Sequence, residues 1–350
     1  MDQWRKRMKK LTAFGELMMR LSPPGKELLY RAPSLRVTFG GAEANVAVLN
    51  ALFGDDAEFV TALPENDWGR TAVAELAACG VGTGKILFTE GRMGVYFTET
   101  GSNMRPSKVL YDRDGSAFAC LKKDSIDWKK ALTDCDWFHV TGITPALTEA
   151  LCAQSLCAAD HCRAAGVRVS FDVNYRSKLW RWGRTAEEVI PMFLSRADVV
   201  FAGVDDHCRC LGYAQDEKKN KLPYAEQFVG MCDKMFDTYP GISCIASGLR
   251  RSENADRNEW GGILCLRGEA KPYISRTYAI SDIVDRIGVG DCFAGALIYA
   301  LRHSMKPQES VDFAAAASAL KYTHYGDFMQ EDLNSVQALV RGGDGGRVCR

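Results

Sequence analysis

Short β-rich runs alternate with longer amphipathic runs along most of this 350-residue sequence. Continuous or period-two apolar runs predict strands, and apolar residues three and four positions apart predict helices. The predicted strands cover residues 11–17, 57–63, 136–140, 167–173, 197–202 and 241–247. The predicted helices cover residues 42–53, 68–79, 147–165, 225–239 and 310–323. A chain that alternates in this way is expected to form an α/β fold, with a mostly parallel sheet covered by helices on both faces.

Two segments break this alternation, about residues 18–40 and 92–122. The second has period-two stretches and turn residues but no helical pattern, so it offers little apolar surface for a core of its own. We expect the two segments to form a small β lid over a cleft in the main body. No repeat, low-complexity tract or linker divides the chain, so residues 1–350 are expected to form a single domain that carries this lid.

The charge balance argues against a polyanionic partner. Lysine plus arginine and aspartate plus glutamate both total 44, so no net charge attracts nucleic acid or an anionic membrane. An anionic ligand must therefore be held by local groups. Apolar runs are far shorter than the roughly 20 residues of a membrane helix. The basic start MDQWRKRMKK is followed by no apolar stretch or cleavage site, so we expect a cytoplasmic protein.

The thirteen cysteines do not show the spacing of a disulfide framework or a zinc site, and no C-x-x-C motif occurs. Thiols and an imidazole at positions 152, 157, 161 and 162 fall in a predicted helix, where five-residue steps scatter them around the axis. The group His207, Cys208 and Cys210 has ligand types at a spacing unsuited to a metal. Reduced, mostly buried thiols are the expectation.

The stretch DRIGVGDCFAGAL, residues 285–297, carries the strongest chemical signal. Apolar residues after Asp291 recur at helical spacing, so Gly288, Val289 and Gly290 form the turn where a helix begins. Glycine lets the backbone approach a ligand, and the free amides of a first helical turn attract a phosphate. A carboxylate beside them would repel that phosphate unless it takes a proton from the attacking group. The stretch predicts a phosphoryl-transfer site in which Asp291 is the base and residues 288–290 form an anion hole.

A simpler interpretation of the same stretch stays open, in which Asp291 caps the helix and the glycines form a tight loop. Spacing excludes two other phosphate motifs. GVGDCFAG lacks the third glycine of G-x-G-x-x-G, and CGVGTGKI lacks the first glycine and the Ser or Thr of G-x-x-x-x-G-K-[ST]. The predicted site is therefore neither of the dinucleotide-binding type nor of the Walker type.

A second glycine turn lies in FGGAEANVAVLNALFG, residues 39–54, just before another predicted helix. The glycines permit close approach of a ligand, and Asn45 offers both a donor and an acceptor. These groups suit a ligand with several hydroxyls. A plain helix-capping turn fits the pattern equally well.

Taken together, GGAEANVAV and DRIGVGDCFAGALI resemble the paired signatures of the ribokinase-like (PfkB-type) carbohydrate kinases. Further segments resemble one subfamily, the 2-keto-3-deoxygluconate kinases, from about residue 11 to the C-terminus. These segments are FGELMMRLSPPG, RPSKVLYDRDGSAFA, FHVTGITPAL, FDVNYRSKLW and ALKYTHYGDF. The resemblance implies a ribokinase-like three-layer α/β/α fold with a mostly parallel central sheet and a small β lid. It also implies a homodimer formed through the lid.

The resemblance implies a reaction as well, the ATP-dependent phosphorylation of 2-dehydro-3-deoxy-D-gluconate at O6 with Mg²⁺. The carboxylate of this sugar acid needs a cationic partner. Arg113 and Arg176 match the substrate arginines of the family, and a guanidinium group suits a carboxylate better than a lysine does. Surface arginines paired with Asp112 or Asp172 are the alternative.

Further residues take ligand-binding roles by resemblance alone. The sugar side comprises Gly41, Ala42 and Asn45 of the glycine turn and the lid tyrosines Tyr96 and Tyr111, which ordinary lid packing would also explain. The nucleotide side comprises Asn174, Ser247, Gly248, Leu249, Arg250, Gly288 and Gly290. A turn former is the alternative for Asn174.

Asp285 matches a position that helps to bind a monovalent cation, potassium, in relatives, with a plain turn aspartate as the alternative. One segment departs from the subfamily pattern: Gly203, Val204, Asp205 and Asp206 stand where relatives have Asn-Glu-Glu-Asp near the phosphates and magnesium. Asp206 keeps one acid there, and magnesium can be held mainly by ATP oxygens.

Two other functions stay open. The first is a sibling sugar kinase that acts on fructose, ribose or 5-dehydro-2-deoxygluconate. The second is a sugar-acid or nucleotide sensor that keeps the fold but has lost catalysis, which the departure at residues 203–206 favours.

Overall fold

A ten-stranded sheet forms the centre of the molecule in this computed structural model, which describes residues 10–211 and 222–342. The strand order is β13-β12-β11-β10-β9-β8-β1-β4-β5, and β14 also pairs with β12. The strands are β1 (Lys10–Phe14), β4 (Ala57–Pro64), β5 (Ile86–Thr89), β8 (Cys135–Thr141), β9 (Arg168–Asp172), β10 (Val199–Phe201), β11 (Cys244–Ser252), β12 (Asn258–Leu266), β13 (Tyr273–Ile274) and β14 (Tyr278–Ile280).

All pairs from β5 across to β11 are parallel, whereas β12 runs antiparallel to β11, β13 and β14. The predicted α/β fold with a mostly parallel sheet is therefore confirmed. Strand β5 and the antiparallel strands β12, β13 and β14 were not predicted from the sequence. Two of these edge strands have only two or three residues, too few for periodicity to identify.

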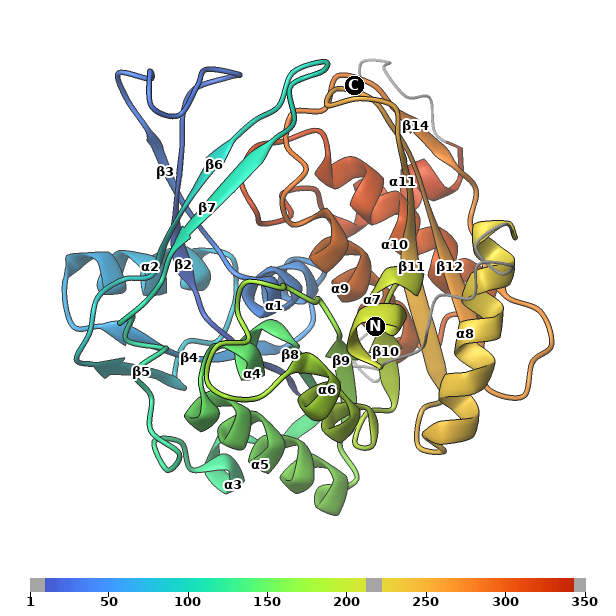
Figure 1. The fold of residues 1–350 in the computed structure, drawn as a ribbon, viewed down its shortest axis with the longest axis horizontal. Helices are drawn as coiled ribbons and strands as arrows, with labels where there is room; N and C mark the ends of the chain where they lie inside the picture. The colour runs from blue at the N-terminus through green and yellow to red at the C-terminus, as the bar shows by residue number, and fades with distance from the viewer. Residues whose placement is uncertain (1–9, 212–221, 343–350) are drawn as a thin grey trace.

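Helices cover the sheet on both faces, and each layer has its own apolar cluster (Figure 1). One layer comprises α1 (Ala42–Leu52), α2 (Asp67–Ala78), α9 (Val289–Arg302), α10 (Pro307–Lys321) and α11 (Leu333–Val340). The other comprises α3 (Trp128–Ala131), α4 (Ile143–Leu147), α5 (Glu149–Ala165), α6 (Ala186–Leu194), α7 (Val204–Cys210) and α8 (Tyr224–Thr238). Successive strand residues point into opposite clusters, as Phe59 and Val60 do. The central sheet is therefore buried on both faces, which explains why its strands are apolar at successive positions.

The lid is a separate four-stranded sheet in the order β3-β2-β6-β7 that projects above one end of the main sheet (Figure 1). Its strands are β2 (Met18–Ser22), β3 (Arg36–Gly40), β6 (Val95–Glu99) and β7 (Lys108–Asp112). They all fall within the two segments expected to form a lid. The chain enters β2 directly from β1 and leaves β3 directly into α1, so the lid is anchored beside the carboxyl ends of the central strands.

No helix in the described residues is long and apolar enough to cross a membrane. Most of the basic start, residues 1–9, lies outside the described ranges, so the structure does not test the expectation for that segment.

Candidate active site

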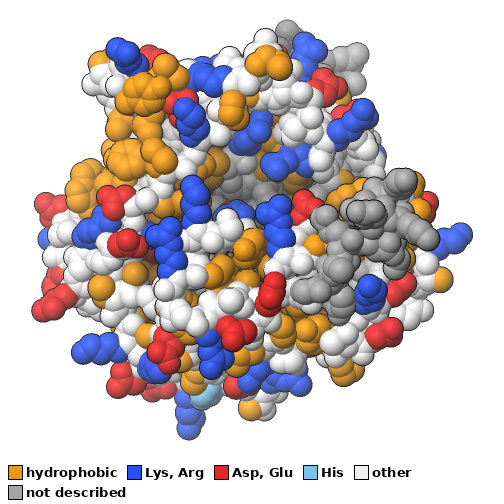
Figure 2. All heavy atoms as spheres, in the orientation of Figure 1, with side chains coloured by type: hydrophobic (Ala, Val, Ile, Leu, Met, Phe, Trp, Pro, Cys, Tyr) orange, Lys and Arg blue, Asp and Glu red, His pale blue; other side chains and the backbone are white. Residues whose placement is uncertain are grey.

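A cavity of about 600 Å³ opens between the lid and the carboxyl ends of the central strands. Its walls come from the ends of β1 and β9, the first turns of α1, α7 and α9, and the inner side of β6 and β7. The strand order reverses at β1, because the chain adds β4 and β5 on one side and β8 to β11 on the other. Ligands of open α/β sheets bind at such a reversal. Basic side chains, blue in Figure 2, border the hollow below the lid.

The turn before α9 forms part of the cavity floor. Gly288 has φ of +79°, and a β-carbon there would lie 2.4 Å from the carbonyl oxygen of Asp327. Both its conformation and its close contact with the 327 backbone require glycine at this position. Gly290 faces open space, so nothing blocks the amides of the first helical turn from the cavity. This geometry suits an anion at the start of a 14-residue helix.

Val289, the third residue of the expected anion hole, points elsewhere. Its side chain is buried in the apolar cluster under α9 and does not line the cavity. The side chain of Val289 therefore does not lie beside the amides of the turn. Only the backbone of Val289 can take part in an anion hole.

Asp291 lies in the first turn of α9 and faces the cavity. Nδ2 of Asn45 donates a 2.6 Å hydrogen bond to Oδ2 of Asp291. Burial raises the pKa of Asp291 to about 7, against the opposing effect of this hydrogen bond. A carboxyl group that titrates near neutrality can accept a proton from an alcohol during turnover, whereas a capping aspartate is ordinarily fully ionised.

The packing of α1 against α9 brings the two glycine turns together. The position of a β-carbon on Gly295 would lie only 3.3 Å from Cα of Val46, so the two helices approach closely. Nδ2 of Asn50 also donates a 3.1 Å hydrogen bond to the carbonyl oxygen of Gly295. Both helices therefore begin at the same end of the cavity, where Asn45 meets Asp291.

The turn before α1 is glycine-rich for a reason that the sequence analysis missed. A β-carbon on Gly41 would lie 2.0 Å from the carbonyl oxygen of Glu16. Close approach to the backbone just after β1 therefore requires glycine at this position. Gly41, Ala42 and Asn45 nevertheless all line the cavity, as the sugar-binding assignment requires. Glu43 anchors the turn, since its Oε1 accepts hydrogen bonds from the amide and hydroxyl of Thr141.

The two lid tyrosines lie in the cavity wall and stack on each other, with ring centroids 5.8 Å apart. The hydroxyl of Tyr96 is buried and donates a 2.6 Å hydrogen bond to Oδ2 of Asp327. Tyr111 is half-exposed and covers the outer side of the pair. Tyr111 is therefore better placed than Tyr96 to offer a free ring face to a ligand.

The two predicted substrate arginines differ in their surroundings. Arg113 is 7% exposed, and its Nε donates a 2.8 Å hydrogen bond to Oε2 of Glu16, which Nη2 also contacts. Its charge is thus already balanced by a buried carboxylate. Arg176 is exposed, lines the cavity and, among the described residues, has no carboxylate within ion-pair distance. Arg176 is the freer of the two to receive the carboxylate of a substrate.

Three of the carboxylates that line the cavity influence one another. Asp172, at the end of β9, and Asp206, in α7, line it together with Asp291. Burial raises the pKa of Asp172 well above its ordinary value, and the charges of Asp291 and Asp206 raise it further. From the sequence, Asp172 was expected only as a possible partner for a surface arginine. Its position at the end of a central parallel strand is the signal that could have identified it.

The residues assigned to the nucleotide divide into two groups. Asn174 and Arg250 line the cavity, and Asn174 has φ of +37°, with its amide held by Oδ1 of Asp172. Ser247, Gly248 and Leu249 do not line it, because residues 244–252 form β11 and pair with β12. Leu249 packs against the apolar cluster under α8.

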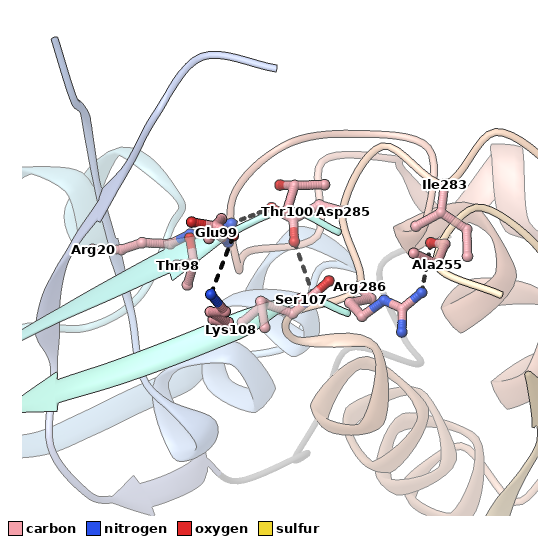
Figure 3. A pocket seen from close by; sticks show the side chains of 11 residues that line it. Arg20, Thr98, Glu99, Thr100, Ser107, Lys108, Ala255, Ile283, Asp285 and Arg286 are labelled. Carbon is pink, nitrogen blue, oxygen red and sulfur yellow. Dashed lines mark hydrogen bonds and ion pairs between the residues drawn. The ribbon is translucent and has the colours of Figure 1, made fainter. Parts of the chain in front are cut away.

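Arg286 is a cavity residue that the sequence analysis missed. Its Nη2 donates a 2.7 Å hydrogen bond to the carbonyl oxygen of Ala255, as Figure 3 shows. Burial lowers the pKa of Arg286, and the positive charge of Arg250 lowers it further. Two arginines thus stand beside the anion turn without a carboxylate at ion-pair distance among the residues the structure describes. A pair of this kind attracts a polyanionic ligand.

Asp285 does not face the cavity and is 3% exposed. Its Oδ2 lies 2.6 Å from Nη2 of Arg20, so the position expected to hold a monovalent cation is paired with a guanidinium group. Because N–H donors occupy this carboxylate, it does not fit a potassium ion.

The family model described as the pfkB family carbohydrate kinases matches residues 8–236 and 262–330 of this chain. The chain belongs to this family. The enzymes of this family are phosphotransferases with an alcohol acceptor, which agrees with an anion turn beside a titratable carboxylate.

Several relatives of this pfkB-family kinase are similar along nearly the whole chain. A 2-dehydro-3-deoxygluconokinase structure from Thermotoga maritima is 39% identical, with a TM-score of 0.89 and coverage of 95% of this chain and 100% of that one. A 2-dehydro-3-deoxygalactonokinase from Haloferax volcanii is 32% identical over 96% of this chain and 98% of its own. A 2-dehydro-3-deoxygluconokinase from Thermoproteus tenax is 26% identical over 91% of this chain and 89% of its own.

Proposed function

We propose that this pfkB-family kinase transfers the γ-phosphoryl group of ATP to the 6-hydroxyl of 2-dehydro-3-deoxy-D-gluconate. The products would be 2-dehydro-3-deoxy-6-phospho-D-gluconate and ADP. The observation that carries the proposal is the position of Asp291. Its carboxyl group lies beside an open anion turn, and the same cavity contains Arg176, which has no carboxylate at ion-pair distance within residues 10–211 and 222–342. The names of the Thermotoga, Haloferax and Thermoproteus relatives support a six-carbon 2-keto-3-deoxy acid as the substrate.

In the proposed mechanism, the sugar acid lies between the turn before α1 and the lid. Arg176 receives its carboxylate, with Arg113 close behind, while Tyr111 covers one side of the carbon chain. Asn45 holds Asp291, which takes the proton of the 6-hydroxyl as that oxygen attacks the γ-phosphorus of ATP. The bond from the γ-phosphorus to the bridging oxygen then breaks, and ADP leaves. The amides of residues 288–291 stabilise charge on the transferring group.

The nucleotide would occupy the other half of the cavity. Arg250 and Arg286 would bind its phosphates, and Asn174 would lie beside them. Proteins that share this fold have been crystallised with ATP, including a fructokinase from Xylella fastidiosa. Closure of the lid over both substrates would exclude water, which otherwise competes as an acceptor.

The carboxylates of the cavity fit a magnesium ion in part. Among the described residues, no three acidic, histidine or cysteine side chains come close enough to form a metal site by themselves. Asp206, with Asp172 beside it, could supply one or two oxygen ligands, and ATP oxygens and water would supply the others. Magnesium bound in this way would neutralise phosphate charge and orient the γ-phosphoryl group.

We also propose that the chain acts as one kinase unit and dimerises through its lid. Val37 and Leu110 are large apolar residues that are at least two-fifths exposed on lid strands, and orange side chains gather on the lid in Figure 2. Pairing of two lids would cover them. Sedimentation of the wild type and of Leu110→Asp tests this proposal, because a lid dimer should become monomeric in the variant.

The 4-epimer, 2-dehydro-3-deoxy-D-galactonate, is a second candidate substrate because the Haloferax relative carries that name. An ADP-release assay with both epimers, 5-dehydro-2-deoxygluconate, fructose and ribose distinguishes the candidates. We expect one or both 2-keto-3-deoxy acids to give kcat/KM at least ~100-fold above the neutral sugars, since a lost ion pair costs several kcal/mol. Phosphorus NMR of the product would identify the phosphorylated oxygen.

Faster turnover of fructose or ribose would replace the proposal with a sibling sugar kinase. Binding of a sugar acid and ATP without release of ADP would indicate a sensor that has lost catalysis.

A further inference from the structure

A cluster of buried charged side chains lies directly behind the anion turn. Its members have no role in the proposed phosphoryl-transfer step itself. Arg20 reaches the cluster from lid strand β2 and is 2% exposed. Its Nη2 lies 2.6 Å from Oδ2 of Asp285, and its Nη1 lies 2.8 Å from Oδ1 of Asp327. Nε donates a 3.0 Å hydrogen bond to Thr98 of the neighbouring lid strand. Figure 3 shows Arg20, Thr98 and Asp285 around one narrow pocket below the lid.

The cluster holds the anion turn in place. Oδ1 of Asp285 accepts a 3.0 Å hydrogen bond from the amide of Ile287, one residue before Gly288. Oδ2 of Asp285 accepts another, of 3.1 Å, from the amide of Gly326. The next residue, Asp327, is the one whose carbonyl oxygen lies 2.4 Å from the position that a β-carbon on Gly288 would take. The carboxylate of Asp285 therefore joins the turn to the segment that packs behind it.

Charges within this cluster balance. Asp285 and Asp327 supply two negative charges, Arg20 supplies one positive charge, and Lys321 supplies the other. Lys321 is 0% exposed, and its Nζ donates a 3.4 Å hydrogen bond to the carbonyl oxygen of His324. Burial lowers the pKa of Lys321, and the two carboxylates oppose that shift. Two buried cations for two buried anions leave no net negative charge for an added ion.

The hydrogen bonds that Asp285 accepts also argue against a cation bound at this carboxylate. A potassium ion needs carboxylate or carbonyl oxygens with free lone pairs directed at it. Both oxygens of Asp285 already accept from backbone N–H groups, and Oδ2 also contacts the guanidinium of Arg20. Three of the roughly four lone pairs of this carboxylate thus face N–H groups, and one of those groups carries the positive charge of Arg20.

We propose that the positive charges of Arg20 and Lys321 replace the charge of a bound monovalent cation behind the anion turn, so that this kinase needs no potassium. Arg20 is then a positioning residue that acts on the transferring phosphoryl group through Asp285 and the anion turn. Since Arg20 belongs to the lid, the same contact links the base of the lid to that turn. This inference rests on the proposed kinase activity, but its test can be separated from that proposal.

The first experiment uses the wild-type protein desalted into tetramethylammonium chloride. ADP release is first measured with magnesium and ATP salts that contain no sodium or potassium. It is then measured with added KCl or NaCl at constant ionic strength. We expect unchanged kcat and KM for ATP. Activation by potassium in the ~5–150-fold range typical of an effector would overturn the inference.

A second experiment replaces the guanidinium. Arg20→Met removes the charge with little loss of volume, leaves Asp285 and Asp327 with one buried cation, and should lower turnover. Addition of KCl, ammonium chloride or guanidinium chloride at low concentration should restore part of it. Arg20→Lys should need no added cation. Arg92→Met is the matched control, because Arg92 pairs with Asp112 on the exposed side of the lid and should respond to no cation.

Full activity of Arg20→Met without any added cation would contradict the inference, as would a folded but inactive variant that no cation restores. If Arg20→Met does not fold, the wild-type salt series still decides. If the wild type releases no ADP with any acceptor, the proposed function fails. Calorimetric binding of ATP with and without potassium then tests the cation inference separately, with equal affinities expected.

Discussion

Nδ2 of Asn45 donates a 2.6 Å hydrogen bond to Oδ2 of Asp291, although 246 residues separate them along the chain. This contact joins the glycine turn before α1 to the anion turn before α9. It also sets the charge state of the proposed base, because a donor stabilises the ionised carboxylate while burial destabilises it. The balance leaves the pKa of Asp291 at about 7.

The first prediction concerns pH. Asp291 must be ionised to accept a proton, so kcat/KM should rise with unit slope through an apparent pKa near 7 and level off above it. In Asn45→Ala the lost donor should raise that pKa, so the rise should move to higher pH. A pH series of both proteins measures this, and an unmoved profile would contradict the assigned role of Asn45.

Asp291→Asn keeps the shape of the side chain and removes the base. We expect kcat to fall by about 10²- to 10⁴-fold, while calorimetric affinities for ATP and the sugar acid stay close to those of the wild type. Turnover equal to that of the wild type would exclude Asp291 as the base.

The two arginines of the acid end should behave differently. Arg176→Ala should raise KM for the sugar acid by about 10- to 100-fold, since a hydrogen bond to a charged group contributes ~1.5–3 kcal/mol, and should leave the melting temperature unchanged. Arg113→Ala leaves the buried Glu16 without its partner and should lower the free energy of unfolding by about 3–5 kcal/mol. Glu16→Gln combined with Arg113→Met tests whether that loss comes from the unpaired charge.

Arg286→Gln should weaken ATP binding because it removes one of the two arginines beside the anion turn. We expect KM for ATP to rise by about tenfold or more, with a smaller change in KM for the sugar acid. Arg251→Gln is the matched control, since Arg251 is 82% exposed and pairs with Glu259 at the edge of the sheet. Equal effects of the two variants would indicate a general charge effect instead of a phosphate contact.

The glycines of the anion turn offer a stability test. Gly288→Ala places a β-carbon at positive φ and 2.4 Å from the Asp327 carbonyl oxygen, so it should destabilise the fold by at least ~1–3 kcal/mol. Gly290→Ala meets no atom within 4 Å and should unfold at the temperature of the wild type. Thermal denaturation of both variants compares them directly. Equal melting temperatures would show that the turn can relax away from residue 327.

Local chemistry in the sequence predicted the α/β fold and the lid. Strands that are buried on both faces appear in the sequence as continuous apolar runs, and helices repeat their apolar residues over three or more turns. These elements can therefore be predicted from the pattern of side chains alone. The turn at 288–290 and the acid after it were predictable for the same reason. Helix geometry fixes where the first free amides lie once the helix start is known. The edge strands β13 and β14 were not predictable, because each has too few residues to show a pattern.

Contacts between distant segments were decided by the tertiary structure. Glu16 meets Arg113 across 97 residues, and Arg20 of lid strand β2 meets Asp285 beside the anion turn, so an expected substrate arginine and an expected cation site each have a protein partner. The pairing of β11 with β12 likewise keeps Ser247, Gly248 and Leu249 out of the cavity lining. Periodicity and turn chemistry describe neighbours along the chain, whereas these pairings depend on strand order and on how α1 packs against α9. The sequence by itself determined which groups the site contains, and the packing decided which of those charges remain free to act on a ligand.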